Sequence, residues 1–125
     1  MALLERLGAA DHAEVLAGAL PPGLARRVEI ARALATGPSL LLLDEPAAGL
    51  NETEQVDLAQ RLRRIADAGV ALLVIEHNMP FLTPLADRMS CLDHGRLIAA
   101  GTPAQVQSDP RVIEAYLGTP PAIVR

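Results

Sequence analysis

The sequence predicts an α/β fold built around a parallel sheet. Two short apolar runs, Leu40–Leu43 and Val70–Ile75, have the length of a buried strand, and each ends in polar residues. Between them, residues 52–68 repeat apolar side chains at helical spacing, and Gly69 follows as a stop signal. A strand, a helix and a strand in this order form a βαβ unit, whose parallel strands are usually buried on both faces.

The first long element that we expect is a helix that opens just after Pro21-Pro22-Gly23. From Leu24 onward, apolar residues recur with helical spacing as far as Leu34. The free N–H groups at the start of such a helix favour an anion.

The first strand ends in two adjacent carboxylates, Asp44 and Glu45. In open α/β sheets, ligands bind at the carboxyl ends of the strands. Two like charges there need compensation, which Mg²⁺ with a polyphosphate would supply. One acid would then hold the metal or its water, and the other would orient or deprotonate an attacking water. The alternative is a strand that ends in a solvated acidic turn.

The second strand is followed by Glu76 and His77, so this histidine also lies at a strand's carboxyl end. There it could meet a phosphate, although a single histidine after a strand is more often a surface or capping residue. His12 has no evident partner, and we expect it to be an exposed helical residue.

Downstream, we expect a short helix and a β-hairpin. The helix covers 79–85, and the strands cover 88–93 and 96–100, joined by His94-Gly95 as a tight turn. Thr102 should cap a further short helix that begins at Pro103. The single cysteine, Cys91, excludes an internal disulfide and is expected to be a buried, inert thiol.

Composition excludes several classes of function. The formal net charge of -4, with one phenylalanine and one tyrosine, argues against nucleic acid as a partner. No apolar run approaches the length of a membrane span, and the first residues lack a signal-peptide pattern. We therefore expect no direct insertion into a membrane, and any membrane contact to run through a partner protein.

The segment LLLLDEPAAGLN at 40–51 resembles the Walker B motif and D-loop of ATP-binding-cassette (ABC) ATPases. The resemblance implies that Asp44 holds Mg²⁺ through water and that Glu45 is the general base for ATP hydrolysis. EHNM at 76–79 resembles the EHDM of amino-acid importer cassettes, which implies that His77 is the switch histidine that bonds the γ-phosphate. The loop through which two cassettes touch would consist of Ala48, Gly49, Leu50 and Asn51.

The segment LPPGLARRVEIARAL at 20–34 resembles the cassette signature, LSGGQ followed by RRVEIARAL. The resemblance implies that this helix binds the γ-phosphate held by the opposite subunit, through Pro21, Pro22, Gly23 and Leu24. The head of the motif departs from the family, because Pro21 replaces its serine, Pro22 replaces the residue after the serine, and Leu24 and Ala25 replace two glutamines. We therefore expect a weaker contact with ATP across the dimer.

The resemblance covers residues 1–118, is closest to branched-chain amino acid importer cassettes, and implies a partial P-loop NTPase fold with a C-terminal β-hairpin. It assigns 1–36 to part of the helical subdomain with the signature helix, and 37–118 to Walker B, D-loop, H-loop and C-terminal elements. A terminal helix would cover 112–117, and 119–125 would be a tail. The chain has no lysine and no G-x-x-x-x-G-K, so we expect the Walker A half to be absent and the chain alone to be inactive.

Three functions follow as hypotheses. The first is an ATP-hydrolysing subunit of an ABC importer for branched-chain amino acids, with ATP and Mg²⁺ as cofactors. Its partners would be a second cassette in a head-to-tail dimer and transmembrane permease subunits, at the cytoplasmic face of the plasma membrane. The second is a truncated, non-catalytic cassette fragment that acts only as an interaction module. The third, a DNA-repair type of ABC ATPase, is disfavoured because no heptad flanks suggest coiled coils.

Overall fold

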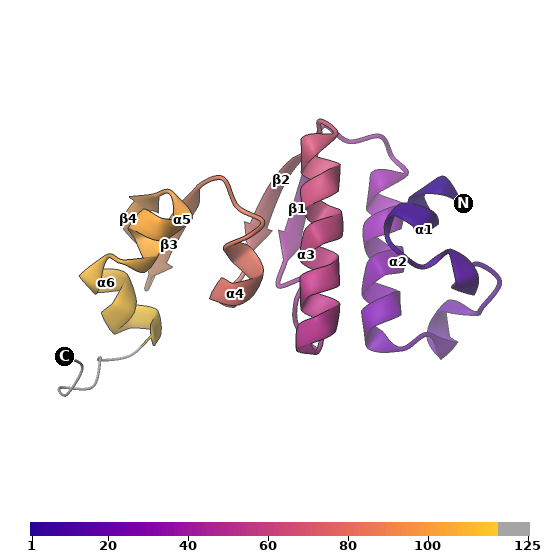
Figure 1. Cartoon of the computed structure of the whole chain (residues 1–125), viewed down its shortest axis with the longest axis horizontal. Helices are drawn as coiled ribbons and strands as arrows, with labels where there is room; N and C mark the ends of the chain where they lie inside the picture. The colour runs from indigo at the N-terminus through magenta and orange to yellow at the C-terminus, as the bar shows by residue number, and fades with distance from the viewer. Residues whose placement is uncertain (118–125) are drawn as a thin grey trace. The chain divides into compact units, whose positions relative to one another are not determined.

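The computed structural model describes residues 1–117, which form two compact units, one over Met1–Leu85 and one that begins at Ala86 (Figure 1). The first unit contains α1 (Ala2–Arg6), η1 (Ala10–His12), η2 (Ala17–Ala19), α2 (Pro22–Leu34), β1 (Leu40–Asp44), α3 (Glu52–Asp67), β2 (Ala71–Ile75) and α4 (Met79–Leu82). The second contains β3 (Met89–Asp93), β4 (Arg96–Gly101), α5 (Pro103–Gln107), α6 (Pro110–Val112) and the π-helical turn η3 (Ile113–Leu117). The expected tail, 119–125, lies outside the described residues. The boundary between the two units, after Leu85, lies inside the segment that the resemblance assigned as 37–118. The assignment of 1–36 to a helical subdomain stays a prediction.

The predicted βαβ unit is confirmed. Strands β1 and β2 pair in parallel, with Leu40 opposite Ala71 and Asp44 opposite Ile75. Helix α3 connects them and lies across the sheet in Figure 1, with α2 beside it. The carboxyl ends of the two strands therefore meet at one edge, where the polar residues of both strand ends come together.

Helix α3 is fixed at both ends by local sequence. Its N-cap is Asn51, whose side chain accepts from the Glu54 N–H while the Glu54 carboxylate accepts from the Asn51 N–H, a complete capping box. Gly69 follows the helix with φ 110°, a conformation that glycine adopts without a steric penalty. The buried side of the helix carries Leu58, Ala59, Leu62 and Ile65.

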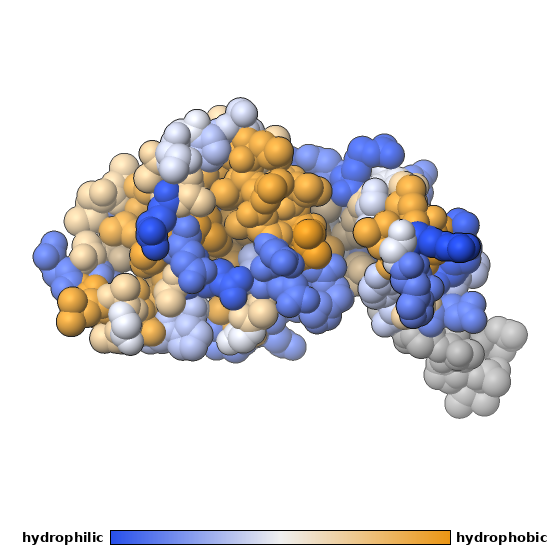
Figure 2. All heavy atoms as spheres, turned by 180° about the vertical axis from the view of Figure 1, so that it is seen from behind, coloured by the Kyte–Doolittle hydropathy of each residue, from blue (hydrophilic) through white to orange (hydrophobic). Residues whose placement is uncertain are grey.

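The expectation that the first strand is fully buried is wrong, and the second strand is likewise open on one face. Along β1, Leu41 and Leu43 are buried, whereas Leu40 and Leu42 are 52% and 64% exposed. On β2, Leu73 and Ile75 are 56% and 61% exposed. Successive side chains of a strand point to opposite faces, and α3 covers only one of them. Figure 2 shows hydrophobic residues gathered on the uncovered side of this unit.

Two details of the N-terminal segment also differ from expectation. Helix α2 begins at Pro22 rather than Leu24, because proline at the first helical position needs no N–H and its fixed φ suits a helix. His12 lies in the 3₁₀ turn η1 and is half-buried, not exposed, and its Nδ1 atom is buried without a hydrogen-bond partner.

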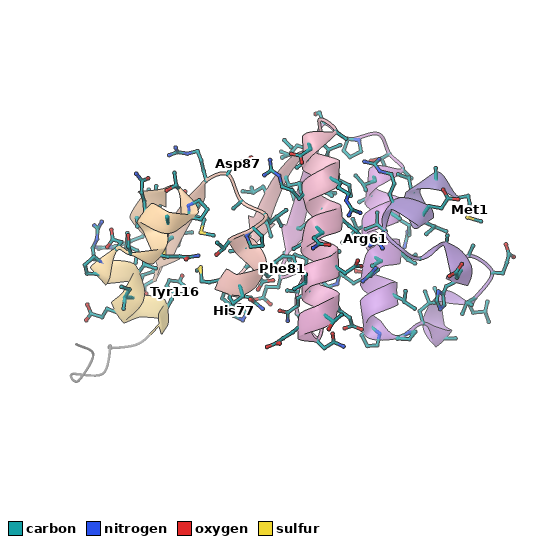
Figure 3. The ribbon with its side chains drawn as sticks, in the orientation of Figure 1. Met1, Arg61, His77, Phe81, Asp87 and Tyr116 are labelled. Atoms are coloured by element: carbon teal, nitrogen blue, oxygen red, sulfur yellow. The ribbon has the colours of Figure 1, made fainter. Side chains whose placement is uncertain are left out.

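An arginine–aspartate cluster joins α1, α2 and α3. Arg27 and Arg61 contact the Asp57 carboxylate at 2.7 and 2.8 Å. The same arginines donate to carbonyls at the end of α1, Arg27 to Leu7 at 3.0 Å and Arg61 to Arg6 at 3.0 Å. Figure 3 shows Arg61 on α3. Cations suit the carbonyl end of a helix, so the cluster fixes α1 on the other two helices.

Asp57→Asn should remove part of the acid sensitivity of folding. Burial raises the pKa of Asp57, but hydrogen bonds and charge from Arg61 and Arg27 outweigh it, so the pKa lies below the ordinary value of 3.8. A carboxyl with a lowered pKa stabilises the fold above pH 3.8, and this contribution is lost as the pH falls through the lower, folded-state pKa. At neutral pH, urea unfolding should show that Asp57→Asn lowers the free energy of unfolding by about 1 kcal/mol. The loss is small because solvent partly screens the contacts between Asp57 and the two arginines.

The difference in the free energy of unfolding between the Asp57→Asn variant and the unsubstituted chain should vanish as the pH falls below 3.8 and through the lower, folded-state pKa. Asp11→Asn, at an exposed position, is the matched control and should leave the profile unchanged. Parallel pH profiles for the Asp57→Asn variant and the unsubstituted chain would contradict the assignment.

The second unit contains the predicted hairpin. Strands β3 and β4 pair antiparallel, and the turn between them has φ 48° at His94 and φ 77° at Gly95, which are the positive values that a tight hairpin turn requires. Thr102 caps α5 by accepting from the Gln105 N–H, and Pro103 occupies the first turn, as expected. The terminal helix, expected over 112–117, is formed by the end of α6 and by η3. Among the helices of residues 1–117, none has the length and apolar content needed to cross a bilayer.

Cys91 should react slowly with thiol reagents in the folded chain. It is 6% exposed in β3, and burial, more than any other effect, raises the pKa of its thiol above the ordinary value of 9.0. Since the thiolate is the reactive form, we expect Ellman's reagent at pH 7 to modify the native chain at least about tenfold more slowly than the chain unfolded in urea. Equal rates would show that β3 is open in solution.

Candidate functional site

The site lies at the edge where β1 and β2 end. Asp44 is the last residue of β1, Glu45 follows it, and His77 comes two residues after Ile75, the last residue of β2. The Glu45 N–H donates to the Ile75 carbonyl at 2.7 Å and continues the ladder beyond the strand ends. The structure therefore brings together the two acids and the histidine that the sequence singled out.

Glu45 has a left-handed backbone, with φ 48°. Such a conformation costs a residue with a Cβ about 1–3 kcal/mol, so its surroundings must hold it. The Glu45 carbonyl accepts from the Ala48 N–H at 3.1 Å and from the Arg26 guanidinium of α2 at 3.1 Å. The strand ends at Asp44, where this turn begins. The side chains of Asp44 and Glu45 therefore do not follow the rule that successive side chains of a strand point to opposite faces.

His77 faces two carboxylates. Its Nδ1 lies 3.4 Å from Oε1 of Glu45 and 3.6 Å from Oε1 of Glu76. The imidazole is 71% exposed, and Figure 3 shows its position near α4. With Nδ1 directed at the acids, Nε2 is the ring nitrogen left for a ligand. A protonated ring can donate from both nitrogens at once, whereas a neutral ring donates from only one.

The donor set fits Mg²⁺ held together with phosphates. Asp44 is exposed, and among residues 1–117 its carboxylate has no hydrogen-bond or ion-pair partner. No group of three or more His, Cys, Asp or Glu side chains in this part of the chain could form a cage for a metal ion. Mg²⁺ commonly keeps several waters and binds through one or two carboxylates plus substrate phosphates, so one free carboxylate suffices.

The start of α2 offers few hydrogen-bond donors. Pro21 is the N-cap without a side-chain capping bond, and neither Pro21 nor Pro22 has an N–H. The Ala25 N–H donates to the Pro21 carbonyl, so Gly23 and Leu24 carry the open N–H groups. A Cβ on Gly23 would lie 3.2 Å from Leu50 and 3.3 Å from the Glu54 carboxylate, so this glycine allows a close approach.

The four predicted interface residues differ in their surroundings. Ala48, Gly49 and Asn51 are exposed, whereas Leu50 is 8% exposed and packs inside the first unit. Asn51 also caps α3. The contact of this loop with a second cassette stays a prediction, and its side-chain contribution would come from Ala48 and Asn51 rather than Leu50.

Sequence reasoning gave no role to Glu76, whose side chain is only 2% exposed although both neighbouring site residues are largely exposed. Its Oε2 accepts from the Ala47 N–H at 3.1 Å and its Oε1 accepts from the His77 N–H at 3.0 Å. The sequence did contain a signal for Glu76, because this carboxylate directly follows the apolar run of the second strand. The strand pairs with β1, so a residue at its end lies next to the segment that follows β1.

Solved structures identify the class of protein. Two structures described as the ATP-binding cassette MJ1267 of an ABC transporter superpose with a TM-score of 0.84 at 32% sequence identity. One of them, in the ADP conformation, is matched over 94% of this chain and 48% of that chain. The fold is therefore a partial α/β P-loop NTPase fold of the cassette type.

Sequence comparison identifies the family. Residues 1–48 match the family described as ABC transporter, and residues 96–122 match the branched-chain amino acid ATP-binding cassette transporter family. LivG of Escherichia coli K12, a high-affinity branched-chain amino acid transport ATP-binding protein, is 42% identical over 116 residues, which are 92% of this chain and 46% of LivG. BraF of Pseudomonas aeruginosa, described in the same words, is 41% identical over the same shares.

The lipopolysaccharide export ATP-binding protein LptB of E. coli K12 is 39% identical over 99 residues, 79% of this chain and 41% of LptB. The chain belongs to the family of ABC transporter ATP-binding cassettes, and it spans about half the length of the relatives it matches.

Proposed function

We propose that the chain supplies the Walker B, D-loop, H-loop and signature-helix part of a cassette that hydrolyses ATP. The observation that supports this most directly is the meeting of Asp44, Glu45 and His77 at the ends of two paired parallel strands, with His77 Nδ1 3.4 Å from the Glu45 carboxylate. A strand-end acid pair beside an exposed imidazole suits a polyphosphate with its metal better than it suits a solvated turn.

Each residue has one role in this proposal. Asp44 holds a water of the Mg²⁺ shell, and bound Mg²⁺ would neutralise charge on the phosphates. Glu45 accepts the proton of the water that attacks the γ-phosphate. His77 donates from Nε2 to a γ-phosphate oxygen while Nδ1 remains on the acids.

The signature end would act on the ATP of a second cassette in a head-to-tail dimer. Only the Gly23 and Leu24 N–H groups and the N-terminal dipole of α2 are available there, because the prolines donate nothing. A phosphate would thus be held by two backbone N–H groups without a serine hydroxyl or a glutamine amide. This arrangement supports a weaker contact across the dimer than the standard signature makes.

The transport role that we propose is import of branched-chain amino acids, through permease subunits at the inner face of the plasma membrane. LivG and BraF carry that description, and the match at residues 96–122 is specific to that branch. LptB is named for lipopolysaccharide export, so export is the alternative. The C-terminal match favours import.

The 125 residues alone should not hydrolyse ATP. They contain no lysine, and a phosphate loop of the G-x-x-x-x-G-K type uses one to reach the β- and γ-phosphates. On its own, the chain would act at most as an interaction module. The experiments below therefore use a joined cassette, in which this chain replaces the 116 matched residues of E. coli LivG and is fused to the rest of LivG.

The test is uptake of labelled leucine by E. coli cells that lack LivG and carry the joined cassette. Restored uptake, lost with Asp44→Asn, is the expected result. A joined cassette that binds and hydrolyses ATP without restoring uptake would contradict the importer role and leave the ATPase role standing. A folded cassette without Mg²⁺-dependent ATP binding would contradict both roles.

A further inference from the structure

Glu76 is a buried carboxylate between two exposed site residues. Its side chain is 2% exposed, against 53% for Glu45 and 71% for His77. A buried carboxylate is unfavourable unless hydrogen bonds or a cation compensate for its lost hydration. The Glu76 carboxylate accepts hydrogen bonds from the backbone N–H groups of Ala47 and His77, and Nδ1 of the His77 imidazole lies 3.6 Å from its Oε1.

The two N–H groups come from the two different strand ends. Ala47 belongs to the turn that follows Glu45, and it is 4% exposed, so its N–H would otherwise be buried and unpaired. His77 belongs to the segment that follows β2. One carboxylate therefore holds the segment after β1 and the segment after β2 at a fixed separation.

We propose that Glu76 is a positioning residue that holds Glu45 and His77 in register for their work on ATP. It acts through the peptide N–H groups of Ala47 and His77 and does not itself face the ligand. Its charge also lies beside Nδ1 of His77, which directs that nitrogen inward and leaves Nε2 outward. The inference rests on the proposed function, which assigns Glu45 and His77 their roles toward ATP. The hydrogen-bond geometry around Glu76 can nevertheless be tested without ATP.

The test is Glu76→Gln in the isotope-labelled 125-residue chain. The Ala47 and His77 N–H groups bond different oxygens of the carboxylate. The amide keeps the size of the side chain, but it has an oxygen in only one of these two places, and its NH₂ group opposes the other N–H. We expect amide hydrogen exchange at Ala47 or His77 to rise at least about tenfold, with no change at Leu62 in the core. The nuclear Overhauser contact between the Glu45 side chain and the His77 ring should weaken or disappear.

Glu14→Gln, at an exposed position of the same unit, is the matched control and should change neither readout. Unchanged Ala47 and His77 protection in the Glu76→Gln variant would overturn the proposal. Equal loss of protection at Ala47, His77 and Leu62 would also overturn it, since Glu76 would then support the fold in general.

A second measurement needs no variant. The hydrogen bond from Ala47 to Glu76 should give a scalar coupling between the Ala47 amide nitrogen and the Glu76 carboxylate carbon in the unsubstituted chain, and its absence would overturn the proposal. In the joined cassette, Glu76→Gln should lower kcat about tenfold with little change in KM for ATP. If the exchange and Overhauser results hold but the unsubstituted joined cassette binds no ATP, the proposed function fails and the positioning geometry stands.

Discussion

Glu45→Gln is expected to lower ATP hydrolysis by the joined cassette by about 10²- to 10⁴-fold, the usual contribution of a general base. Glutamine has nearly the same shape, but its amide does not accept the proton of the attacking water. The left-handed backbone and its hydrogen bonds to Ile75, Ala48 and Arg26 involve no side-chain atom of Glu45, so the turn should persist. Phosphate release measures the rate, and calorimetry should show ATP binding within about threefold of the unsubstituted protein, because this interaction belongs to the transition state.

Glu14→Gln is the matched control, since it removes an exposed carboxylate from the N-terminal segment of the same unit. It should leave both quantities unchanged. A Glu45→Gln protein with an undiminished rate would show that another residue accepts the proton. Equal losses of rate and binding would place Glu45 in ground-state binding instead.

Leu62→Ala is expected to destabilise the first unit by about 2–5 kcal/mol. Leu62 is 0% exposed on the buried side of α3, where a truncated side chain leaves a cavity that close-packed neighbours fill only in part. A loss of this size is a large part of the 5–15 kcal/mol that stabilises a typical domain. Urea unfolding followed by circular dichroism at 222 nm measures it, since the long helices α2 and α3 dominate that signal.

Val56→Ala is the control on the same helix, because Val56 is 58% exposed. We expect a change within about 0.5 kcal/mol, as at ordinary surface positions. If Leu62→Ala lowered the free energy of unfolding no more than Val56→Ala does, the result would contradict the burial of this side of α3.

Much of the fold was predictable because local chemistry and tertiary structure agree. The run from Leu40 to Asp44 is a strand, Thr102 is an N-cap, and the His94-Gly95 turn closes a hairpin. Each of these features depends on the residue itself and its near neighbours. The meeting of Asp44, Glu45 and His77 also followed, because parallel pairing of two adjacent strands leaves one arrangement of their ends.

Features that depend on distant residues were not predictable. A run of four leucines is apolar at every position and indicates burial on both faces, yet only one face of β1 is covered within a chain that spans about half of its relatives. The burial of Leu50 against the start of α2 depends on the helix packing. The role of Glu76 depends on the path of the turn after β1, which brings the Ala47 N–H to it.

The most direct test of the proposed ATP site is to replace Mg²⁺ by paramagnetic Mn²⁺ in the joined cassette with ATP and to follow the broadening of the amide resonances. The resonances of Asp44, Glu45 and His77 should broaden beyond detection, while those of Ser39 and Gly69, at the opposite edge of the sheet about 17 Å away, should broaden far less and remain visible. Asp44→Asn should reduce the effect. Broadening that spares the Asp44 edge, or that falls on Ser39 and Gly69 instead, would contradict an ATP site at the carboxyl ends of β1 and β2.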